Sequence, residues 1–197
     1  MKILILGLTL ALSTLHISSC STQPLLQKGM PSISLSDYEN LVESKTKKIE
    51  SYSGLTNQLN VSATKIDSQM NEALLTRSAQ IYEWNGVTFQ EEKTKNAAVL
   101  AAKTEFFISF YTPERQHNNL NSSKSIWKIY LDIDGNRFEG KATKLKAQLV
   151  DIQSLYPHHT RFGSPYKIEF FTPTNTIENK PVTLTFTGPN ASVKLIF

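Results

Sequence analysis

The chain has a single cysteine among its 197 residues, and it lies near the start, at Cys20. One cysteine cannot form a disulfide within a chain, so side-chain packing must hold the fold together. A bias toward one charge is also missing, because 21 Lys and Arg residues face 17 Asp and Glu residues. This balance argues against nucleic acid as a partner. Beyond Cys20, no apolar run reaches the roughly 20 residues that a membrane-spanning helix needs.

The start of the chain has the features of an export signal. Lys2 precedes a mostly apolar stretch, Ile3–Ile17, and the stretch leads into Ile17-Ser18-Ser19-Cys20. About 15 apolar residues are too few to span a bilayer. The four residues resemble the lipobox of bacterial lipoproteins, and Ser21 resembles the outer-membrane sorting signal of enteric-like bacteria. The resemblance implies cleavage before Cys20, a diacylglycerol on its sulfur and a third acyl chain on its new amino terminus. Several acyl chains hold a protein stably at a membrane.

We therefore expect three segments: a lipoprotein signal peptide (1–19), a lipidated tether (20–35) and a single domain (36–197). Prolines, a glycine and hydroxyl residues between 21 and 35 are typical of a tether. Loss of Lys2 with the leader leaves 20 basic residues against 17 acidic ones, a balance of +3. The remaining length suits one domain with a real hydrophobic core.

Helical periodicity dominates the first part of the domain. Ser36 and Glu39 have capping-box spacing, and apolar residues follow one helical face to Tyr52, so a helix is expected up to Gly54. Alternation in Leu55–Ile66 predicts a strand. A helical block from about 68 to 103 follows, with a break at Asn85-Gly86.

From residue 105 onward the apolar period changes to two, which predicts strands separated by turns. Asp134-Gly135-Asn136 is a hairpin-type turn, since its glycine is misplaced for a calcium-binding EF-hand loop. We expect an α+β fold: an antiparallel β-sandwich of about seven or eight strands, an N-terminal helix, and a helical insertion between the first two strands. The later strands are expected in FFISFYTP, SIWKIYLDI, Lys141–Tyr156 (one or two), PYKIEFF, PVTLTFTG and ASVKLIF.

The body of the chain also resembles a known group of proteins. The resemblance runs from about Tyr38 and is carried by SATKIDSQMNEA, TEFFISFYTPERQHNNLNSSKSIWKIYLDIDG, YPHHTRFGSPYKIEFF and VTLTFTGPNASVKLIF. These stretches are similar to a group of uncharacterised bacterial envelope lipoproteins. The resemblance implies an envelope location and carries no activity or catalytic residue.

Patterns that would indicate catalysis or a metal are lacking. The only cysteine is assigned to the anchor, and FGSPY lacks the spacing of a G-x-S-x-G nucleophile elbow. His158 and His159 could bind one metal only from a loop, and no third ligand is evident nearby. We therefore expect no enzyme activity, no cofactor and no metal.

Two polar loops form the candidate binding surface, because loops carried on a rigid scaffold often bind partners. They are Thr112–Ser123 and the HHTRFGSPY segment. Within them, the candidate binding residues are His117, Asn118, Asn119, His158, His159 and Arg161.

A set of basic residues is the other surface feature. It could contact anionic headgroups, although lysines that protect exposed strand edges are the favoured interpretation. The set comprises Lys124, Lys128, Arg137, Lys141, Lys144 and Lys146.

The leading functional hypothesis is a lipid-anchored, non-enzymatic envelope protein that binds or scaffolds a protein partner. The expected location is the outer membrane, on either its periplasmic or its surface face. The alternative is a ligand-binding envelope module for a lipid or glycan. A cavity lined by Trp127, Phe110 or Tyr166 would favour the alternative, and a solid core with an exposed apolar patch would favour the partner. A hydrolase would need a cleft that joins a histidine to a carboxylate.

Overall fold

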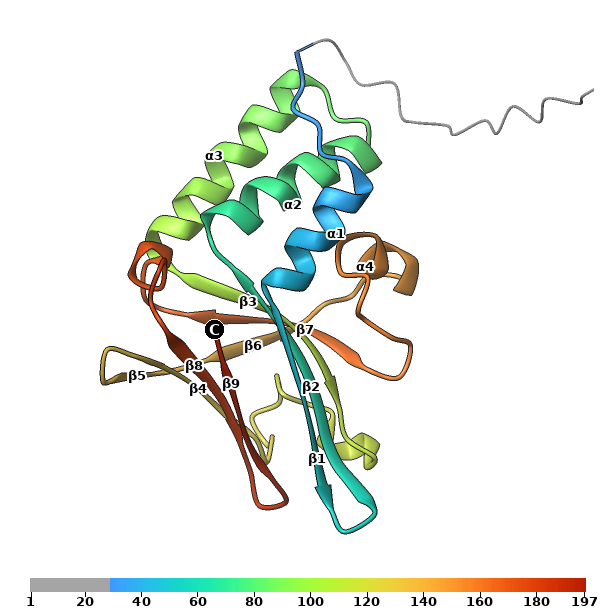
Figure 1. The fold of residues 1–197 in the computed structure, drawn as a ribbon, viewed down its shortest axis with the longest axis vertical. Coiled ribbons are helices and arrows are strands. Elements are labelled where there is room, and N and C mark those ends of the chain that lie inside the picture. Colours follow the sequence, from blue (N-terminus) through green and yellow to red (C-terminus); the bar gives the residue numbers. More distant parts are fainter. Residues whose placement is uncertain (1–28) are drawn as a thin grey trace, which may run out of the picture.

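The computed structural model describes residues 29–197, so Cys20, the expected signal peptide and the first part of the tether lie outside the described residues. The described chain forms four α-helices, two 3₁₀ helices and nine β-strands (Figure 1). The helices are α1 (Leu35–Ser44), α2 (Ser68–Ile81), α3 (Gly86–Ala102) and α4 (Leu149–Leu155), with η1 (Arg115–His117) and η2 (Thr174–Thr176). The strands are β1 (Thr46–Ser53), β2 (Thr56–Ile66), β3 (Thr104–Tyr111), β4 (Lys128–Ile133), β5 (Asn136–Glu139), β6 (Lys141–Lys144), β7 (Ser164–Phe170), β8 (Val182–Thr187) and β9 (Ser192–Ile196).

The strands form two antiparallel sheets, which confirms the expected α+β class with an N-terminal helix. The five-stranded sheet has the order β1-β2-β3-β7-β6, and the four-stranded sheet has the order β5-β4-β8-β9. Because side chains alternate along a strand, one face of each sheet supplies the same hydrophobic core. Its fully buried members include Val61, Phe106, Ile108, Phe110, Tyr166, Ile168, Leu131, Leu184 and Phe186.

The expected first helix was too long. Helix α1 ends at Ser44, and Thr46–Ser53 forms β1 instead of further helical turns. Gly54, at φ +60°, makes the tight turn that returns the chain into β2, and β1 pairs with β2 along its whole length. Strand pairing therefore overrides the helical spacing of the few apolar residues in this stretch. The helix is capped by Ser34, whose Oγ accepts from the Asp37 N–H at 3.0 Å, and not by Ser36.

Two further expectations need correction. The helical insertion lies between β2 and β3, the second and third strands, because β1 precedes them. The Lys141–Tyr156 segment contains one strand, β6, in agreement with the expected one or two, but the helix α4 follows it where no helix was expected. Ile152 and Tyr156 of this segment pack on Ile66 and Phe107 of the five-stranded sheet, outside the shared core.

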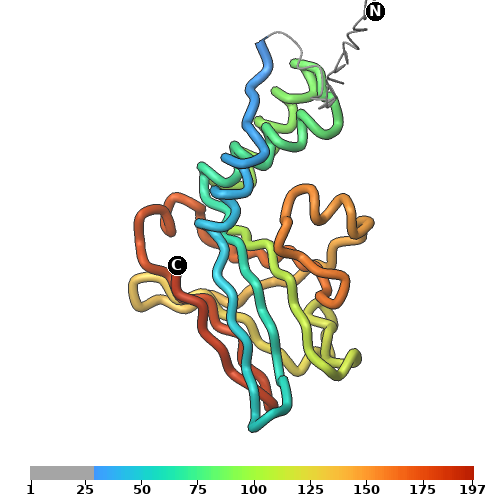
Figure 2. The backbone as a smooth tube through the Cα atoms, turned by 45° about the vertical axis from the view of Figure 1, so that its right-hand side comes forward, coloured from blue at the N-terminus to red at the C-terminus, as the bar shows by residue number. Residues whose placement is uncertain are grey.

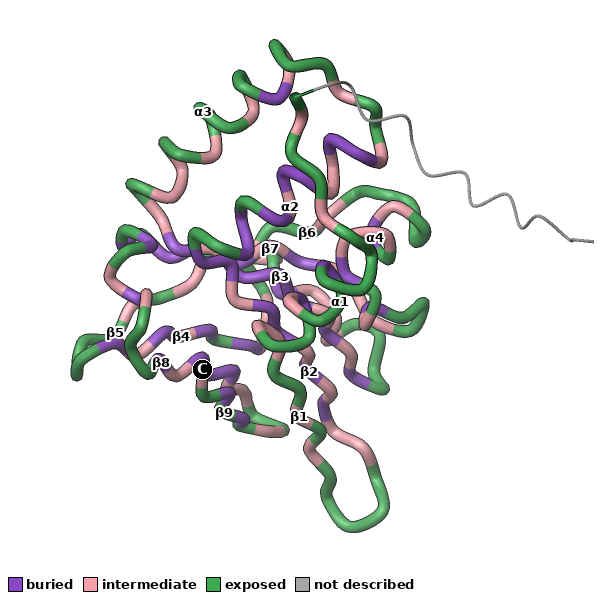
Figure 3. Tube along the Cα trace, turned by 45° about the horizontal axis from the view of Figure 1, so that its top comes forward, coloured by how far each residue is buried: buried purple, intermediate pink, exposed green. Residues whose placement is uncertain are grey.

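Helices α1, α2 and α3 gather at one end of the molecule, and the tip of the β1–β2 hairpin projects from the other (Figures 1 and 2). The described chain starts at the helical end. There Met30 packs against the Leu75, Ala79 and Phe89 cluster, and the Ile33 carbonyl accepts from Gln80 Nε2 at 3.2 Å. Figure 3 shows that buried residues follow α2 and the sheet cores, whereas α3 and the hairpin tip are mainly exposed.

Candidate functional site

The predicted loop residues after β3 serve mainly to hold the loop together. The Asn118 side chain accepts from the Thr112 N–H at 2.8 Å and donates to the Thr112 carbonyl at 3.2 Å. The His117 carbonyl accepts from Trp127 Nε1 at 3.0 Å, and its ring lies 3.3 Å from Glu114. Asn119 has a side-chain oxygen that is buried without a hydrogen-bond partner. The cavity beside His117 and Trp127 measures about 80 Å³, well below the volume of a ligand site.

The second predicted loop turns its two histidines toward the sheet. His159 is buried, and its Nδ1 lies 2.8 Å from Ser109 Oγ. His158 Nε2 lies 3.4 Å from Thr64 Oγ1, and burial together with Lys48 and His159 lowers its pKa to about 4. Burial also lowers the pKa of His159. Both rings are therefore neutral at pH 7 and cannot attract an anion.

The six predicted residues do not converge on one site. Arg161 is exposed, and its guanidinium stacks on the Phe162 ring at 4.9 Å. Among the hydrogen bonds of residues 29–197, a single one joins the two predicted loops. In it, the hydroxyl of Tyr166, the last residue of HHTRFGSPY, donates to the Asn118 carbonyl at 2.6 Å. Two members of the predicted basic set are neutralised, since Lys128 pairs with Glu139 and Arg137 pairs with Asp132.

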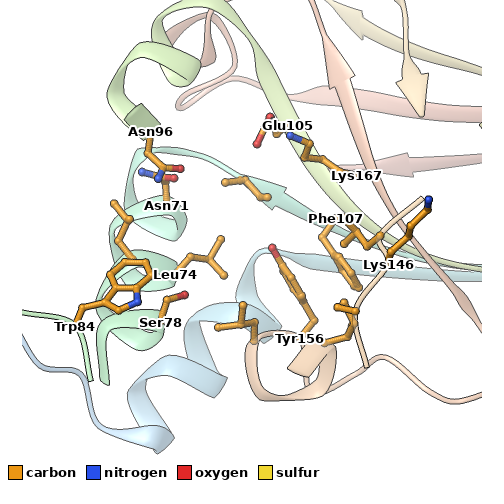
Figure 4. A pocket seen from close by; sticks show the side chains of 16 residues that line it. Asn71, Leu74, Ser78, Trp84, Asn96, Glu105, Phe107, Lys146, Tyr156 and Lys167 are labelled. Atoms are coloured by element: carbon orange, nitrogen blue, oxygen red, sulfur yellow. Dashed lines mark hydrogen bonds and ion pairs between the residues drawn. The ribbon is translucent and has the colours of Figure 1, made fainter. Parts of the chain in front are cut away.

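A cavity of a different kind lies between the helices and the outer face of the five-stranded sheet; we call it the helix–sheet pocket (Figure 4). Its volume of about 470 Å³ falls in the range of small-molecule sites. Its floor is formed by β2, β3 and β7, and its walls by α2, α3, α4 and the segment between β6 and α4. It is lined by Ile66, Asn71, Leu74, Leu75, Ser78, Trp84, Asn96, Glu105, Phe107, Leu145, Lys146, Ala147, Ile152, Leu155, Tyr156 and Lys167.

The spacing of α2 explains how one helix supplies both apolar and polar lining. Asn71, Leu74, Leu75 and Ser78 recur at intervals of three and four residues, so they share one helical face. Asp67 starts this helix, because its carboxylate accepts from the Met70 N–H at 2.9 Å. Helix α2 therefore begins directly after β2, and the face that bears these four residues lines the pocket along the helix.

Asn71 is the most unusual residue of the pocket. The residue as a whole is only 9% exposed, and its carboxamide makes no hydrogen bond with any described residue. Neither amide atom is among the fully buried atoms of the described residues that lack a partner, so the carboxamide opens into the pocket. There it can bond to water or to a ligand. Asn96 lines the pocket from α3 and donates its side-chain N–H to the Glu92 carbonyl at 2.8 Å. The two amides thus present a hydrogen-bonding edge that a ligand could satisfy.

Charged residues of the sheet form a network at the pocket floor. Lys167 Nζ lies 3.0 Å from Glu105 and 3.2 Å from Glu169, and Lys103 lies 3.3 Å from Glu169. Burial raises the pKa of the Glu105 carboxyl despite the ammonium beside it. Burial opposes the charge of Glu169 too, but hydrogen bonds from Lys167 and Lys103 outweigh it and lower that pKa.

Lys146 is the one pocket cation outside this network. Its side chain lines the pocket from the segment after β6, and none of the ion pairs in the described part of the chain includes it. The pocket lining therefore holds the cations Lys146 and Lys167 against the single carboxylate Glu105. The resulting charge of the lining favours a negatively charged group.

Aromatic rings fix the pocket wall nearest α4. The rings of Phe107 and Tyr156 are stacked with their centroids 3.6 Å apart. Burial raises the pKa of the Tyr156 phenol above its usual range, and the Tyr38 phenol behind it donates to the Leu155 carbonyl at 2.7 Å. These contacts hold α4 against α1 and the sheet, so this wall of the pocket is preformed.

A second groove lies between α1, β1 and His158, with a volume of about 580 Å³. Although it is larger, its lining is dominated by charged side chains of α1 and β1, including Glu39, Glu43, Lys47 and Lys48. Such solvated surfaces offer little apolar area to bury, whereas the helix–sheet pocket combines apolar walls with a few placed polar groups.

The pocket residues were missed because their role is invisible in the sequence. Trp84 and Leu74 lie in the predicted helical block 68–103, where apolar residues at helical spacing indicate core positions. The polar residues Asn71 and Ser78 lie on the same side of that helix as Leu74, and this mixture of polar and apolar residues on one face could have indicated a pocket. A ligand cavity at Trp127, Phe110 or Tyr166 would have favoured the ligand-binding alternative. All three residues are packed in the shared core, and the cavity beside Trp127 holds only about 80 Å³.

Three observations bound the chemistry. No cluster of three His, Cys, Asp or Glu residues suited to a metal occurs between residues 29 and 197. In the same range, no helix has the length and apolar character needed to cross a bilayer. Comparison with family models, with curated proteins and with solved structures gives no match for this chain.

Proposed function

We propose that this protein is a lipid-anchored bacterial envelope protein that binds a small amphiphilic ligand in the helix–sheet pocket. The observation that carries the proposal is the carboxamide of Asn71, which has no hydrogen-bond partner among the described residues and opens into a pocket that is otherwise mainly apolar. An apolar body would cover the leucines and aromatic rings, and a polar group would pair with the amide. Both parts of such a ligand would be stabilised in one site.

Binding fits this pocket better than catalysis. The raised pKa of Glu105 is explained by burial and by the neighbouring Glu169 carboxylate, which are structural causes. The same network raises the pKa of Lys167, so this amine stays charged and is a poor nucleophile. No histidine lines the pocket. The proposal is therefore a non-enzymatic protein without a cofactor.

The membrane location rests on the leader sequence. Acyl chains on Cys20 would hold the protein at the envelope, with the outer membrane as the proposed site. Ten residues separate Cys20 from Met30, and a fully extended chain spans at most ~3.6 Å per residue, or about 35 Å. The helical end of the domain, which contains the pocket, would then face the anchoring membrane. The two sheets, as a β-sandwich, would form a rigid support beneath the pocket.

A protein partner is the second candidate, favoured by the tip of the β1–β2 hairpin. Leu55 at this tip is 102% exposed and Tyr52 is 56% exposed, although both are hydrophobic. The tip lies at the end of the molecule opposite the start of the described chain (Figure 2). A partner bound there would sit on the side away from the anchor.

The test of ligand binding uses the full chain with Cys20→Ser, which removes the acylated atom. Titration with a fluorescent polyene fatty acid should show saturable binding. Ala147→Phe would fill the pocket from its exposed rim and should reduce binding at least about tenfold. Ala98→Phe, at an exposed position of α3 outside the pocket lining, is the matched control and should bind normally. Equal binding by both variants, with unchanged melting, would contradict the proposal.

A further inference from the structure

We infer that the ligand of the helix–sheet pocket is a single-chain amphiphile with a monoanionic head, bound with its head at the sheet and its chain end at Trp84. This inference rests on the proposed function and specifies the chemical class and the orientation of the ligand. A carboxylate and a phosphate diester both fit as the head, since both offer one negative charge and acceptor oxygens.

The charge of the pocket selects an anion. Within the floor network, Glu105 and Glu169 are matched by Lys167 and Lys103, so these four groups are neutral together. Lys146 adds one positive charge that no described carboxylate neutralises. A monoanionic head would be attracted by this charge and a cationic head would be repelled by it; because Lys146 is exposed, water and salt screen both effects.

Hydrogen bonding places the head at the sheet end. Asn71 lies in the first turn of α2, close to where the helix leaves β2, and its free N–H groups can donate to an anionic oxygen. Figure 4 shows Asn71 next to Asn96 on the helices, and Glu105 and Lys167 on the strands that face them. The Asn71 amide, near the junction of α2 with β2, and the charged network thus border the part of the pocket next to the sheet.

The chain end belongs at the opposite part. Ser78 is two helical turns beyond Asn71, about 10 Å along α2, and Trp84 follows the end of that helix. Trp84 packs with Leu75, Ala79 and Phe89 in an apolar cluster, and it lies across the pocket from Lys146 and Lys167 (Figure 4). A volume of about 470 Å³ is small for a two-chain lipid and suits one chain.

The two tryptophans of the chain provide a test of orientation. Trp84 lines the pocket, whereas Trp127 is buried in the shared core. In the full chain with Cys20→Ser, hexadecanoate with bromine on its terminal carbon should quench tryptophan fluorescence. Hexadecanoate with bromine next to the carboxylate should quench it much less. Trp84→Phe, which leaves Trp127 in place, should remove the quenching. Stronger quenching by the bromine next to the carboxylate would overturn the orientation.

The charge of the head is tested by affinity. Hexadecanoate should bind about tenfold more tightly than hexadecanol, because a charge-assisted hydrogen bond is stronger than a neutral one. Lys146→Gln should abolish this preference, and Lys144→Gln, an exposed β6 lysine outside the pocket, should preserve it. Titration with lysophosphatidylglycerol, a single-chain phosphate ester, distinguishes the two heads. Tighter binding than that of hexadecanoate would identify a phosphate ester as the head, and weaker binding would identify a carboxylate.

The outcomes separate the two proposals. Equal binding of the acid and the alcohol, unchanged by Lys146→Gln, would overturn the anionic head and leave the amphiphile site intact. Absence of binding by every amphiphile, in a protein that melts cooperatively, would overturn the proposed function and this inference together.

Discussion

The partly buried ring of His158 makes the stability of this protein sensitive to acid in a way that can be calculated. Its pKa is lowered from 6.5 to about 4, first by burial and then by the charges of Lys48 and His159. The folded state holds the ring neutral, while the unfolded chain takes up a proton below pH 6.5. Stability from this group is therefore lost as the pH falls from about 6.5 toward 4.

The expected loss between pH 7 and pH 4.5 is about 2.5 kcal/mol for this single group. His158→Gln removes the titration, together with the ring contacts to Phe107 and Tyr156, whose centroids lie 5.7 and 6.3 Å away. The variant should be less stable than the wild type at pH 7. Between pH 7 and pH 4.5, the free energy of unfolding of the variant relative to that of the wild type should rise by about 2.5 kcal/mol.

The assay is urea unfolding of both proteins at the two pH values. His158→Phe is the matched second variant, because it retains an aromatic ring beside Phe107 and cannot titrate. Its stability at pH 7 should differ from that of His158→Gln, but its gain on acidification should be the same. The carboxylates change the free energy of unfolding by the same amount in all three proteins. Their titration therefore cancels when the variants are compared with the wild type at each pH. A difference between wild type and variants that stays constant from pH 7 to pH 4.5 would refute the reasoning.

Three further results are expected. Deletion of Ala191–Phe197 should abolish cooperative thermal unfolding, because it removes β9 and the Phe197 ring that packs on Phe106 at 5.3 Å; a normal melting transition would contradict this. Lys167→Met should destabilise the protein by about 2 kcal/mol at pH 7, since it removes a shared cation from two largely buried carboxylates. That deficit should shrink in denaturant titrations at pH 4, where Glu105 is protonated; an unchanged deficit would argue against the network. Cys20→Ser should move the protein from the membrane fraction to the supernatant, and continued sedimentation with membranes would disprove the acyl anchor.

The sequence predicted the parts of the fold in which local pattern and tertiary structure agree. Strands such as β8 and β9 alternate cleanly, with Leu184 and Leu195 buried and Thr183 and Lys194 on the other face, so both strands could be predicted. The helical block 68–103 was also expected, and the structure contains α2 and α3 there. In these segments, burial of one face selects the same conformation as the spacing of apolar residues.

Strand β1 could not be predicted in the same way. Ile49 is its only apolar residue packed against the shared core, and its neighbours Lys47, Lys48 and Glu50 are charged. Such a stretch has no alternating apolar face of its own. Its conformation is fixed by hydrogen bonding to β2 through the turn at Gly54, which is a tertiary effect.

The candidate site was beyond sequence reasoning for a related reason. The pocket lining comes from segments that lie as far apart in the chain as Ile66 and Lys167, and no single segment has a recognisable motif. The loops that did attract attention use Asn118 and His159 to hold themselves in place. Polar residues in loops were thus structural, and a polar residue on a helix, Asn71, faces the pocket.

The central claim is that an amphiphile enters the helix–sheet pocket, and the indole N–H signals of the two tryptophans test it most directly. In a proton–nitrogen correlation spectrum of the ¹⁵N-labelled full chain with Cys20→Ser, titration with hexadecanoate should shift the Trp84 indole signal in a saturable manner. The Trp127 signal should stay in place, because its indole donates to the His117 carbonyl inside the core region. A Trp84 signal that does not move at saturating hexadecanoate would contradict the account.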